Sequence, residues 1–233
     1  MPYNVSLPQK SIEVTTPSRL ASGTGQIIWQ EGFEANLNRF DAGGSVVTVA
    51  YKVRQGVYSF KITSAAGEPY KTATGTSTIS IYPEMFNAKI GIEFFVRFEA
   101  VTTAAAGAAS FENYYEIGNG VTKYTPAFQV VFGAAGANCS LQYKDSAGNW
   151  QDIITGLSFA AGYFYRFKLI LNLKTGYYDK LIWGATEYDL SAYAIRTAAY
   201  VHPISLLGYA LTGIDATQKS VWLDDITVTV NEP

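Results

Sequence analysis

The chain has 233 residues, of which 48% are hydrophobic and 15% charged, and its formal net charge at pH 7 is −2. This near-neutral balance, without a cluster of Lys or Arg, gives no electrostatic basis for binding nucleic acid or an anionic membrane surface. No apolar run approaches the roughly 20 residues that a membrane-spanning helix needs. We therefore expect that this protein neither binds nucleic acid nor inserts into a membrane.

The aromatic content points to strands. Seventeen Tyr, 13 Phe and four Trp accompany 21 Gly; aromatic and β-branched residues favour strands, while glycine favours turns. A chain of this length suits one large β-domain. We expect residues 27–233 to form that domain.

The N-terminal residues 1–26 differ in composition, being polar and containing Pro2, Pro8 and Pro17. Such a segment is either a linker or edge strand, or an arm that contacts a neighbouring subunit. The N-terminus lacks the basic start and apolar run of a signal peptide. The protein is therefore expected either inside the cell or a virion, or as the mature part of a longer secreted chain. The single cysteine, Cys139, excludes an intrachain disulfide and is interpreted as a small buried side chain.

Alternation of apolar and polar residues predicts a series of strands with no long amphipathic helix between them. The clearest is Lys89–Ala100, which places Ile90, Ile92, Phe94, Val96 and Phe98 on one face. The predicted strands are Gln26–Phe33, Ser45–Val53, Val57–Ser64, Ser77–Tyr82, Lys89–Ala100, Tyr114–Ile117, Ala127–Phe132, Ser140–Lys144, Tyr163–Leu173, Tyr177–Trp183, Ile204–Leu211 and Val221–Val230. Asp41–Gly44 is expected to form a turn, Ala65–Gly75 and Thr102–Ser110 loops, and Asp145–Trp150 a hairpin loop. Many short strands at this spacing indicate an antiparallel two-sheet sandwich.

The last strand contains an anomaly. Its alternation places Trp222, Ile226, Val228 and Val230 on one face, and the same parity places the carboxylate of Asp224 among them. A buried carboxylate needs hydrogen bonds, a cation or a raised pKa. Asp224 therefore requires a partner from elsewhere in the chain.

The order of several short motifs resembles the concanavalin-like, laminin-G-like jelly-roll domains and the related carbohydrate-binding modules. The motifs are G-F-E at Gly32–Glu34, G-V-Y-S-F-K-I-T at Gly56–Thr63, the long hairpin Tyr165–Gly184, and L-D-D-I-T-V at Leu223–Val228. The resemblance spans roughly residues 28–230. It implies a jelly-roll sandwich with lectin-like glycan recognition and a structural calcium ion.

In these modules an early G-F-E and a late D-D often supply oxygen ligands to calcium. The resemblance therefore nominates Glu34, Asp224 and Asp225 as metal ligands. Calcium takes six to eight oxygen ligands and would neutralise a buried carboxylate. The alternative is that Asp224 accepts backbone hydrogen bonds or pairs with a basic residue.

A catalytic site is not expected. The laminarinase-like hydrolases of this fold carry E-x-D-x-x-E, a motif that the sequence lacks. Glu112 and Glu116 lie too far apart along a strand for the usual carboxylate pair, and Glu187 with Asp189 follow a strand end and look like loop acids. His202 is the one histidine, so a Ser-His-Asp triad or a His-rich zinc site would require unusual substitutions.

The best candidates for sugar recognition are aromatic and amide side chains near the middle of the chain. The candidate set is Tyr114, Tyr115, Tyr124, Gln129, Tyr143 and Trp150. Tyr114 and Tyr115 are adjacent on a strand, so their side chains point to opposite faces. The alternative is that these side chains pack the core and its rim.

The sequence therefore leaves two functions of different class open. The first is a non-catalytic surface-recognition module that binds a polysaccharide or surface glycan. The second is a structural or decoration protein of a virion or other assembly, docked through its N-terminal arm onto capsid or assembly subunits. A polysaccharide hydrolase is a weaker third. The oligomeric state separates the first two, since a binding module is expected to be monomeric.

Overall fold

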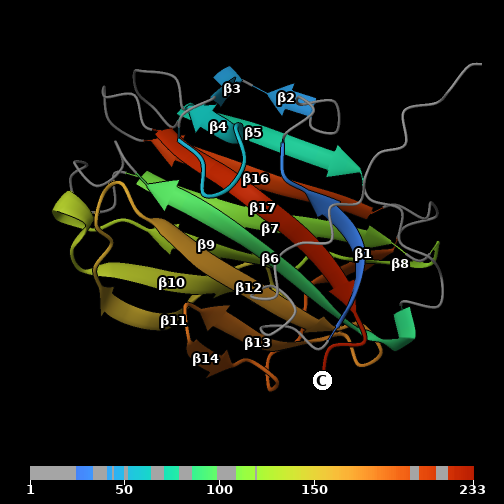
Figure 1. The fold of residues 1–233 in the computed structure, drawn as a ribbon. Helices are drawn as coiled ribbons and strands as arrows, with labels where there is room; N and C mark the ends of the chain where they lie inside the picture. Colours follow the sequence, from blue (N-terminus) through green and yellow to red (C-terminus); the bar gives the residue numbers. More distant parts are fainter. Residues whose placement is uncertain are drawn as a thin grey trace, which may run out of the picture.

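A computed structural model describes residues 25–33, 41–43, 45–49, 52–63, 71–78, 86–98, 109–118, 120–199, 205–213 and 220–233 (Figure 1). The predicted arm lies outside the described residues except for its last two positions, where Gln26 begins a strand. Glu34 and His202 also lie outside them.

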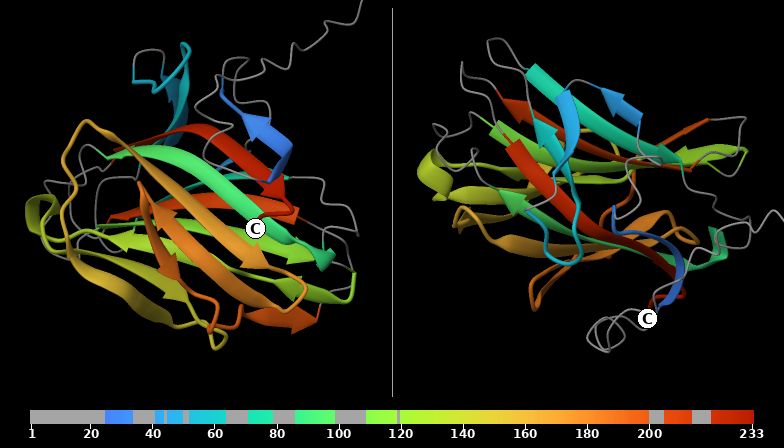
Figure 2. Two further views of the ribbon diagram at one scale, coloured as in Figure 1. Left: turned by 60° about the horizontal axis from the view of Figure 1, so that its bottom comes forward. Right: turned by 45° about the horizontal axis from the view of Figure 1, so that its top comes forward.

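Two antiparallel sheets pack face to face as a sandwich, visible as two layers in Figure 2. We name them sheet A and sheet B. Sheet A runs, from one edge to the other, through β14 (Thr186–Asp189), β13 (Tyr177–Trp183), β12 (Phe164–Asn172), β6 (Lys89–Phe98), β17 (Ser220–Val230), β4 (Ser59–Thr63) and β3 (Ser45–Val49), with β1 (Gln26–Glu31) also paired to β17. The sandwich predicted from the sequence is confirmed.

Sheet B runs through β11 (Trp150–Leu157), β10 (Cys139–Lys144), β9 (Ala127–Val131), β7 (Ala109–Gly118), β16 (Ser205–Gly213), β5 (Lys71–Thr78) and β2 (Asp41–Gly43). The short strand β8 (Thr122–Tyr124) pairs with both β7 and β15 (Thr197–Ala199). The 3-10 turn η3 (Ala134–Gly136) connects β9 to β10. Near it the buried Cys139 thiol donates to Gly136 O and accepts from Gly133 N.

Aromatic rings from both sheets meet in the core. Phe94 of β6 is the centre of this cluster, with ring centroids 5.1–6.0 Å from those of its neighbours Phe111, Phe128, Phe167 and Tyr209. The predicted inward face of β6 is confirmed, because Ile90, Ile92, Phe94, Val96 and Phe98 are all buried in the core. Aromatic pairs at this separation add stabilisation to that of simple area burial.

Several predicted boundaries were wrong. β5 begins at Lys71, inside the predicted loop Ala65–Gly75, and β7 begins at Ala109, five residues before its prediction. The sequence interpretation missed β2, β8, β11, β14 and β15 as strands. Glu187 and Asp189 therefore lie on β14, not in a loop.

The face assignment of the last strand was wrong in its first half. The core contains Val221 and Leu223 together with Ile226, Val228 and Val230. The residues that face inward therefore have odd numbers before Asp224 and even numbers after Asp225. A β-bulge causes the switch, since the register with β6 shifts between Asp224 and Thr227 and Asp225 has φ +52°. Trp222 and Asp224 consequently lie on the outer side of sheet A, where Lys52 and Lys61 cover the indole ring at 4.2 and 5.3 Å.

Tyr178 joins the two sheets through its hydroxyl group. The residue belongs to β13 of sheet A and is 1% exposed. Its Oη accepts from Ala127 N at 3.1 Å and donates to Lys144 O at 2.8 Å, so it contacts the backbones of β9 and β10 in sheet B. Burial raises the pKa of this phenol, which therefore remains a donor at neutral pH.

Tyr178→Phe is expected to lower the free energy of unfolding by about 1–3 kcal/mol, because it leaves Ala127 N–H and Lys144 C=O without this buried partner. Urea denaturation measures the change. Tyr163→Phe is the matched control, since Tyr163 is 67% exposed. Equal stability of Tyr178→Phe and wild type would show that the hydroxyl does not tie the sheets together.

Candidate functional site

The outer side of sheet B carries aromatic, amide and charged side chains in neighbouring strands. Burial alternates strictly along β7, which turns Phe111, Asn113 and Tyr115 inward and leaves Glu112 and Tyr114 outside. The same alternation operates in β10, where Cys139, Leu141 and Tyr143 face the core. We call this surface the sheet B outer face, comprising Glu112, Tyr114, Glu116, Ala127, Gln129, Gln142, Lys144, Trp150, Asp152 and Gly208.

One row of this face, the polar row, crosses four strands. Glu112 is opposite Gln129, Gln129 is opposite Gln142, and Gln142 is opposite Asp152. At the usual strand spacing the row is about 14 Å long. Gln129 Nε2 donates to Gln142 Oε1 at 2.6 Å, and Gln142 Nε2 donates to Asp152 Oδ1 at 2.8 Å. In the described part of the chain no protein donor reaches Gln129 Oε1, so this atom can accept from solvent or a ligand.

A second row, the aromatic row, lies two residues further along the same strands, about 7 Å from the first. It contains Gly208 opposite Tyr114, Tyr114 opposite Ala127, and Lys144 opposite Trp150. The hairpin turn after β10 pairs Lys144 with Trp150 and places the ammonium group 4.9 Å from the centre of a Trp150 ring. Two aromatic side chains thus flank a small residue and a lysine.

Gly208 lies directly beneath the ring of Tyr114. A Cβ atom at position 208 would lie 2.1 Å from Tyr114 Cζ and 2.4 Å from Cε2. The ring therefore rests on the backbone of β16, and any side chain at this position would displace it. This contact fixes the orientation of Tyr114 on the sheet B outer face.

Charged groups surround Tyr114. The Lys144 Nζ atom is 3.7 Å from Glu112 Oε1, and Lys123 Nζ is 3.1 Å from Glu116 Oε1. Burial raises the pKa of Glu112 and outweighs the opposing attraction of Lys144. The pKa of Tyr114 is raised by burial first, and then by the negative charges of Glu112 and Glu116.

Three of the six predicted ligand-binding residues come together here: Tyr114, Gln129 and Trp150. Tyr115 and Tyr143 are 3% and 6% exposed and lie in the core. The Tyr115 hydroxyl bonds to Asn113 Oδ1, and the ring of Tyr143 packs on Tyr178 and Tyr193. Tyr124 of β8 is half-buried and packs against the core rim.

Sequence reasoning did not include Lys144 and Asp152 in the site and considered Glu112 only as a catalytic acid. The signal for Lys144 was present, since the turn residues Asp145–Asn149 predict a hairpin that places Lys144 beside Trp150. Asp152 required the register of β10 with β11, which shifts twice along the pair.

The geometry does not form a paired-carboxylate centre among the described residues. Glu112 and Glu116 are four residues apart on β7, about 13 Å, while glycosidase carboxylates lie roughly 5–9.5 Å apart. Each is instead paired with a lysine. Glu187 on β14 pairs with Lys180 at 3.0 Å, and Asp189 Oδ1 accepts a hydrogen bond from Ser191 N at 2.8 Å.

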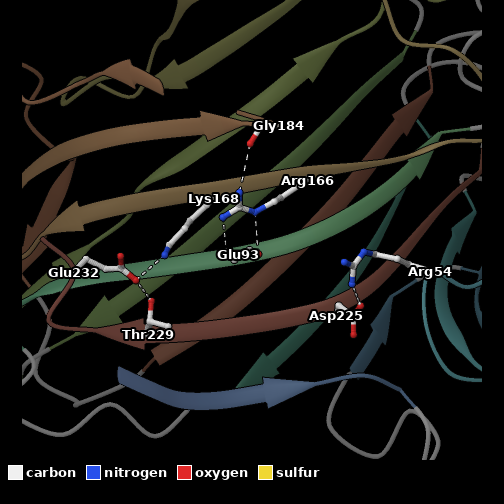
Figure 3. Close-up of polar contacts among 8 residues, drawn as sticks. All are labelled: Arg54, Glu93, Arg166, Lys168, Gly184, Asp225, Thr229 and Glu232. Atoms are coloured by element: carbon white, nitrogen blue, oxygen red, sulfur yellow. Dashed lines mark hydrogen bonds and ion pairs between the residues drawn. The ribbon is translucent and has the colours of Figure 1, made fainter. Parts of the chain in front are cut away.

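The predicted metal ligands Asp224 and Asp225 lie at the β17 bulge. Asp224 Oδ2 accepts from Arg54 N at 2.8 Å and from Gln55 N at 3.2 Å, and its Oδ1 accepts from Asp225 N at 2.9 Å. Asp225 Oδ2 is 2.5 Å from Arg54 Nη1 (Figure 3). These donors fit a carboxylate held by N–H groups, which do not ligate calcium.

No group of three or more His, Cys, Asp and Glu within the described ranges could hold a metal ion. Because Glu34 lies outside those ranges, calcium binding stays a prediction from the resemblance. The described contacts instead account for how the buried Asp224 carboxylate is stabilised.

Asp224→Ala is expected to lower the free energy of unfolding by at least about 3 kcal/mol, since three backbone N–H groups lose a charged acceptor. The loss should be the same in EDTA and in millimolar calcium, as measured by thermal unfolding. If chelation lowers the melting temperature of the wild type and leaves the variant unchanged, Asp224 serves calcium, and the hydrogen-bond account fails.

Several charged side chains on the outer side of sheet A pair with one another (Figure 3). Arg166 makes two 3.0 Å bonds to Glu93, and Lys168 lies 2.8 Å from Glu232 with both side chains 2% exposed. Glu232 also bonds to the Thr229 hydroxyl, which anchors residues 231–233 against β6 and β12. This side therefore serves stability, and the sheet B outer face is the better candidate for ligand binding.

The Gly208 contact gives a test of the site geometry. Gly208→Ala is expected to cost about 1–3 kcal/mol of stability through overpacking against the Tyr114 ring. In a Tyr114→Ala background the same substitution should cost much less, because the ring is absent. Denaturant unfolding of the four proteins measures this coupling, and strictly additive losses would contradict the contact.

In the described part of the chain, no helix is long and apolar enough to cross a membrane.

No protein-family model matches the chain, and no curated protein matches its sequence. Its fold is similar to that of a conserved carbohydrate esterase from Shiga toxin-encoding bacteriophage phi24B, with TM-score 0.61 and 15% identity over 89% of this chain and 99% of the other. It is also similar to the potassium-bound carbohydrate recognition domain of Emp46p, with TM-score 0.53 and 10% identity over 85% and 92%. A third similar structure is the CBM2 module of the evolved Dit of Lactobacillus casei BL23 phage J-1, with TM-score 0.52 and 14% identity over 89% and 96%. These likenesses confirm the predicted jelly-roll fold.

Proposed function

We propose that this protein is a non-catalytic, lectin-like module that binds a glycan on the sheet B outer face. The observation that carries the proposal is the arrangement of two rows: Tyr114 and Trp150 in one, and the bonded amides Gln129 and Gln142 in the other. Sugar rings offer apolar faces to aromatic rings and hydroxyl groups to amides and carboxylates. The two rows present both kinds of partner about 7 Å apart.

The dimensions suit a chain of sugars. Tyr114 on β7 and Trp150 on β11 lie three strand spacings apart, about 14 Å. A ligand that contacts both would cross the strands, with its hydroxyl groups along the polar row. The fold supports this reading, since two of the similar structures are a carbohydrate recognition domain and a CBM2 module.

An enzyme is the weaker candidate. One similar structure is a carbohydrate esterase, but a serine esterase would need a base such as His beside its nucleophile, and His202 lies outside the described residues. On the sheet B outer face, Glu112 and Glu116 are well separated and each pairs with a lysine, and Asp152 accepts a hydrogen bond from Gln142. We therefore assign recognition, not hydrolysis, to this face.

A component of a virus particle is the second candidate, because two similar structures belong to bacteriophage proteins. This role is compatible with glycan binding on the same face. Decoration of an assembly through subunit contacts alone would leave the two rows without a ligand.

Tyr114→Ala and Trp150→Ala are each expected to weaken glycan binding at least tenfold, about 1.4 kcal/mol, with unchanged circular dichroism. A glycan array identifies the ligand, and isothermal titration measures the affinity. Tyr163→Ala is the matched control, since Tyr163 is 67% exposed and precedes β12 of sheet A. A folded wild type with no hit on the array would overturn the proposed function.

A further inference from the structure

The lysines of the sheet B outer face already have anionic partners. Lys144 lies between the Glu112 carboxylate, at 3.7 Å, and a ring of Trp150, at 4.9 Å. Lys123 of β8, at the end of the face, bonds to Glu116 at 3.1 Å. An incoming anion would have to separate one of these pairs before it gained a cation.

The same face carries an excess of carboxylates. Glu112, Glu116 and Asp152 provide three negative charges, whereas Lys144 and Lys123 provide two positive ones. The guanidinium of Arg196 lies over Gly148 at the hairpin tip, outside the two rows. The third carboxylate, that of Asp152, accepts its hydrogen bond from the neutral amide of Gln142, another residue of the polar row.

Such a surface favours neutral ligands for two physical reasons. Sugar hydroxyl groups donate well to carboxylates and to the Gln129 carbonyl oxygen, and hydrogen bonds to charged acceptors are the stronger ones. A uronate carboxylate would lose its hydration without gaining a free cation and would approach like charges. The charge pattern therefore disfavours acidic polysaccharides while leaving hydroxyl recognition intact.

Building on the proposed function, we propose that the sheet B outer face selects uncharged glycans over uronate-containing ones, and that Glu112 determines this specificity by holding the Lys144 ammonium. Glu112 is suited to this role by its position. It ends the polar row, and Lys144 belongs to the aromatic row, so their ion pair spans the two rows.

The experiment compares linear oligosaccharides of equal length: neutral glucans, xylans and mannans against oligouronates of the alginate and pectate types. Wild type should bind at least one neutral series and bind each oligouronate at least tenfold more weakly. In Glu112→Gln the ratio of uronate to neutral affinity should rise at least tenfold at low ionic strength. The gain should shrink in high salt, because the freed ammonium acts electrostatically.

Two further variants isolate the cause. Glu187→Gln removes a carboxylate that pairs with Lys180 on sheet A and should leave the ratio unchanged. Glu112→Gln combined with Lys144→Gln should lose the gain, since no ammonium remains to bind the uronate. A gain that persists in the double variant would assign the selectivity to another group and overturn the role of Glu112.

The outcomes separate the two proposals. Wild type that binds oligouronates as tightly as neutral chains, or a Glu112→Gln variant with an unchanged ratio, overturns the selectivity and leaves glycan binding in place. Wild type that binds neither series overturns the proposed function and this inference together. If Glu112→Gln does not fold, the wild-type comparison still decides the selectivity itself.

Discussion

The bulge at Asp224 and Asp225 is the constraint on which sheet A depends. β17 lies at the centre of that sheet, pairs with β6 along most of its length, and has two different neighbours on its other side. β4 pairs with residues 220–223, and β1 pairs with residues 226–230. The bulge falls between these two segments, where the chain changes partner. Figure 1 shows β1 beside the second half of β17.

A bulge in a central strand leaves backbone and side-chain groups that the ladder does not satisfy. Here the Asp224 carboxylate accepts backbone N–H groups from the segment before β4 and from its own neighbour. The ion pair of Arg54 with Asp225, and the position of the guanidinium 3.7 Å above the Phe95 ring, complete the contact. The two adjacent acids thus attach the segment before β4 to β17, and Arg54 extends the contact to Phe95 of β6.

The sequence predicted the elements whose alternation is unbroken. β6 and the hairpin of β12 with β13 carry long apolar runs, and the prediction placed them correctly. β14 is a mostly exposed strand with one partly buried aromatic residue, Tyr188, so alternation gave no signal there. In β11 the apolar residues Trp150, Ile153, Ile154 and Leu157 do not recur with period two, and the register with β10 shifts twice. In β17 the bulge reverses the parity, which is why Leu223 and Trp222 were assigned to the wrong faces.

The candidate site was predicted only in part for a related reason. Alternation alone shows that Tyr114 and Tyr115 take opposite faces, but it does not say which face is outside. The two rows arise from cross-strand pairing between β7, β9, β10 and β11. Cross-strand register depends on turns and bulges throughout the sheet, so Asp152 could not be placed from its local sequence.

Asp224 contacts the segment before β4 through backbone groups, and this affects which substitutions that segment tolerates. Its Oδ2 atom binds the backbone N–H groups of residues 54 and 55, not the side chains at those positions. Substitutions at Gln55 therefore preserve this anchor as long as the backbone keeps its conformation. Proline is the exception, because it removes the donor. A change of the side chain at position 55 thus leaves these two backbone hydrogen bonds of Asp224 in place.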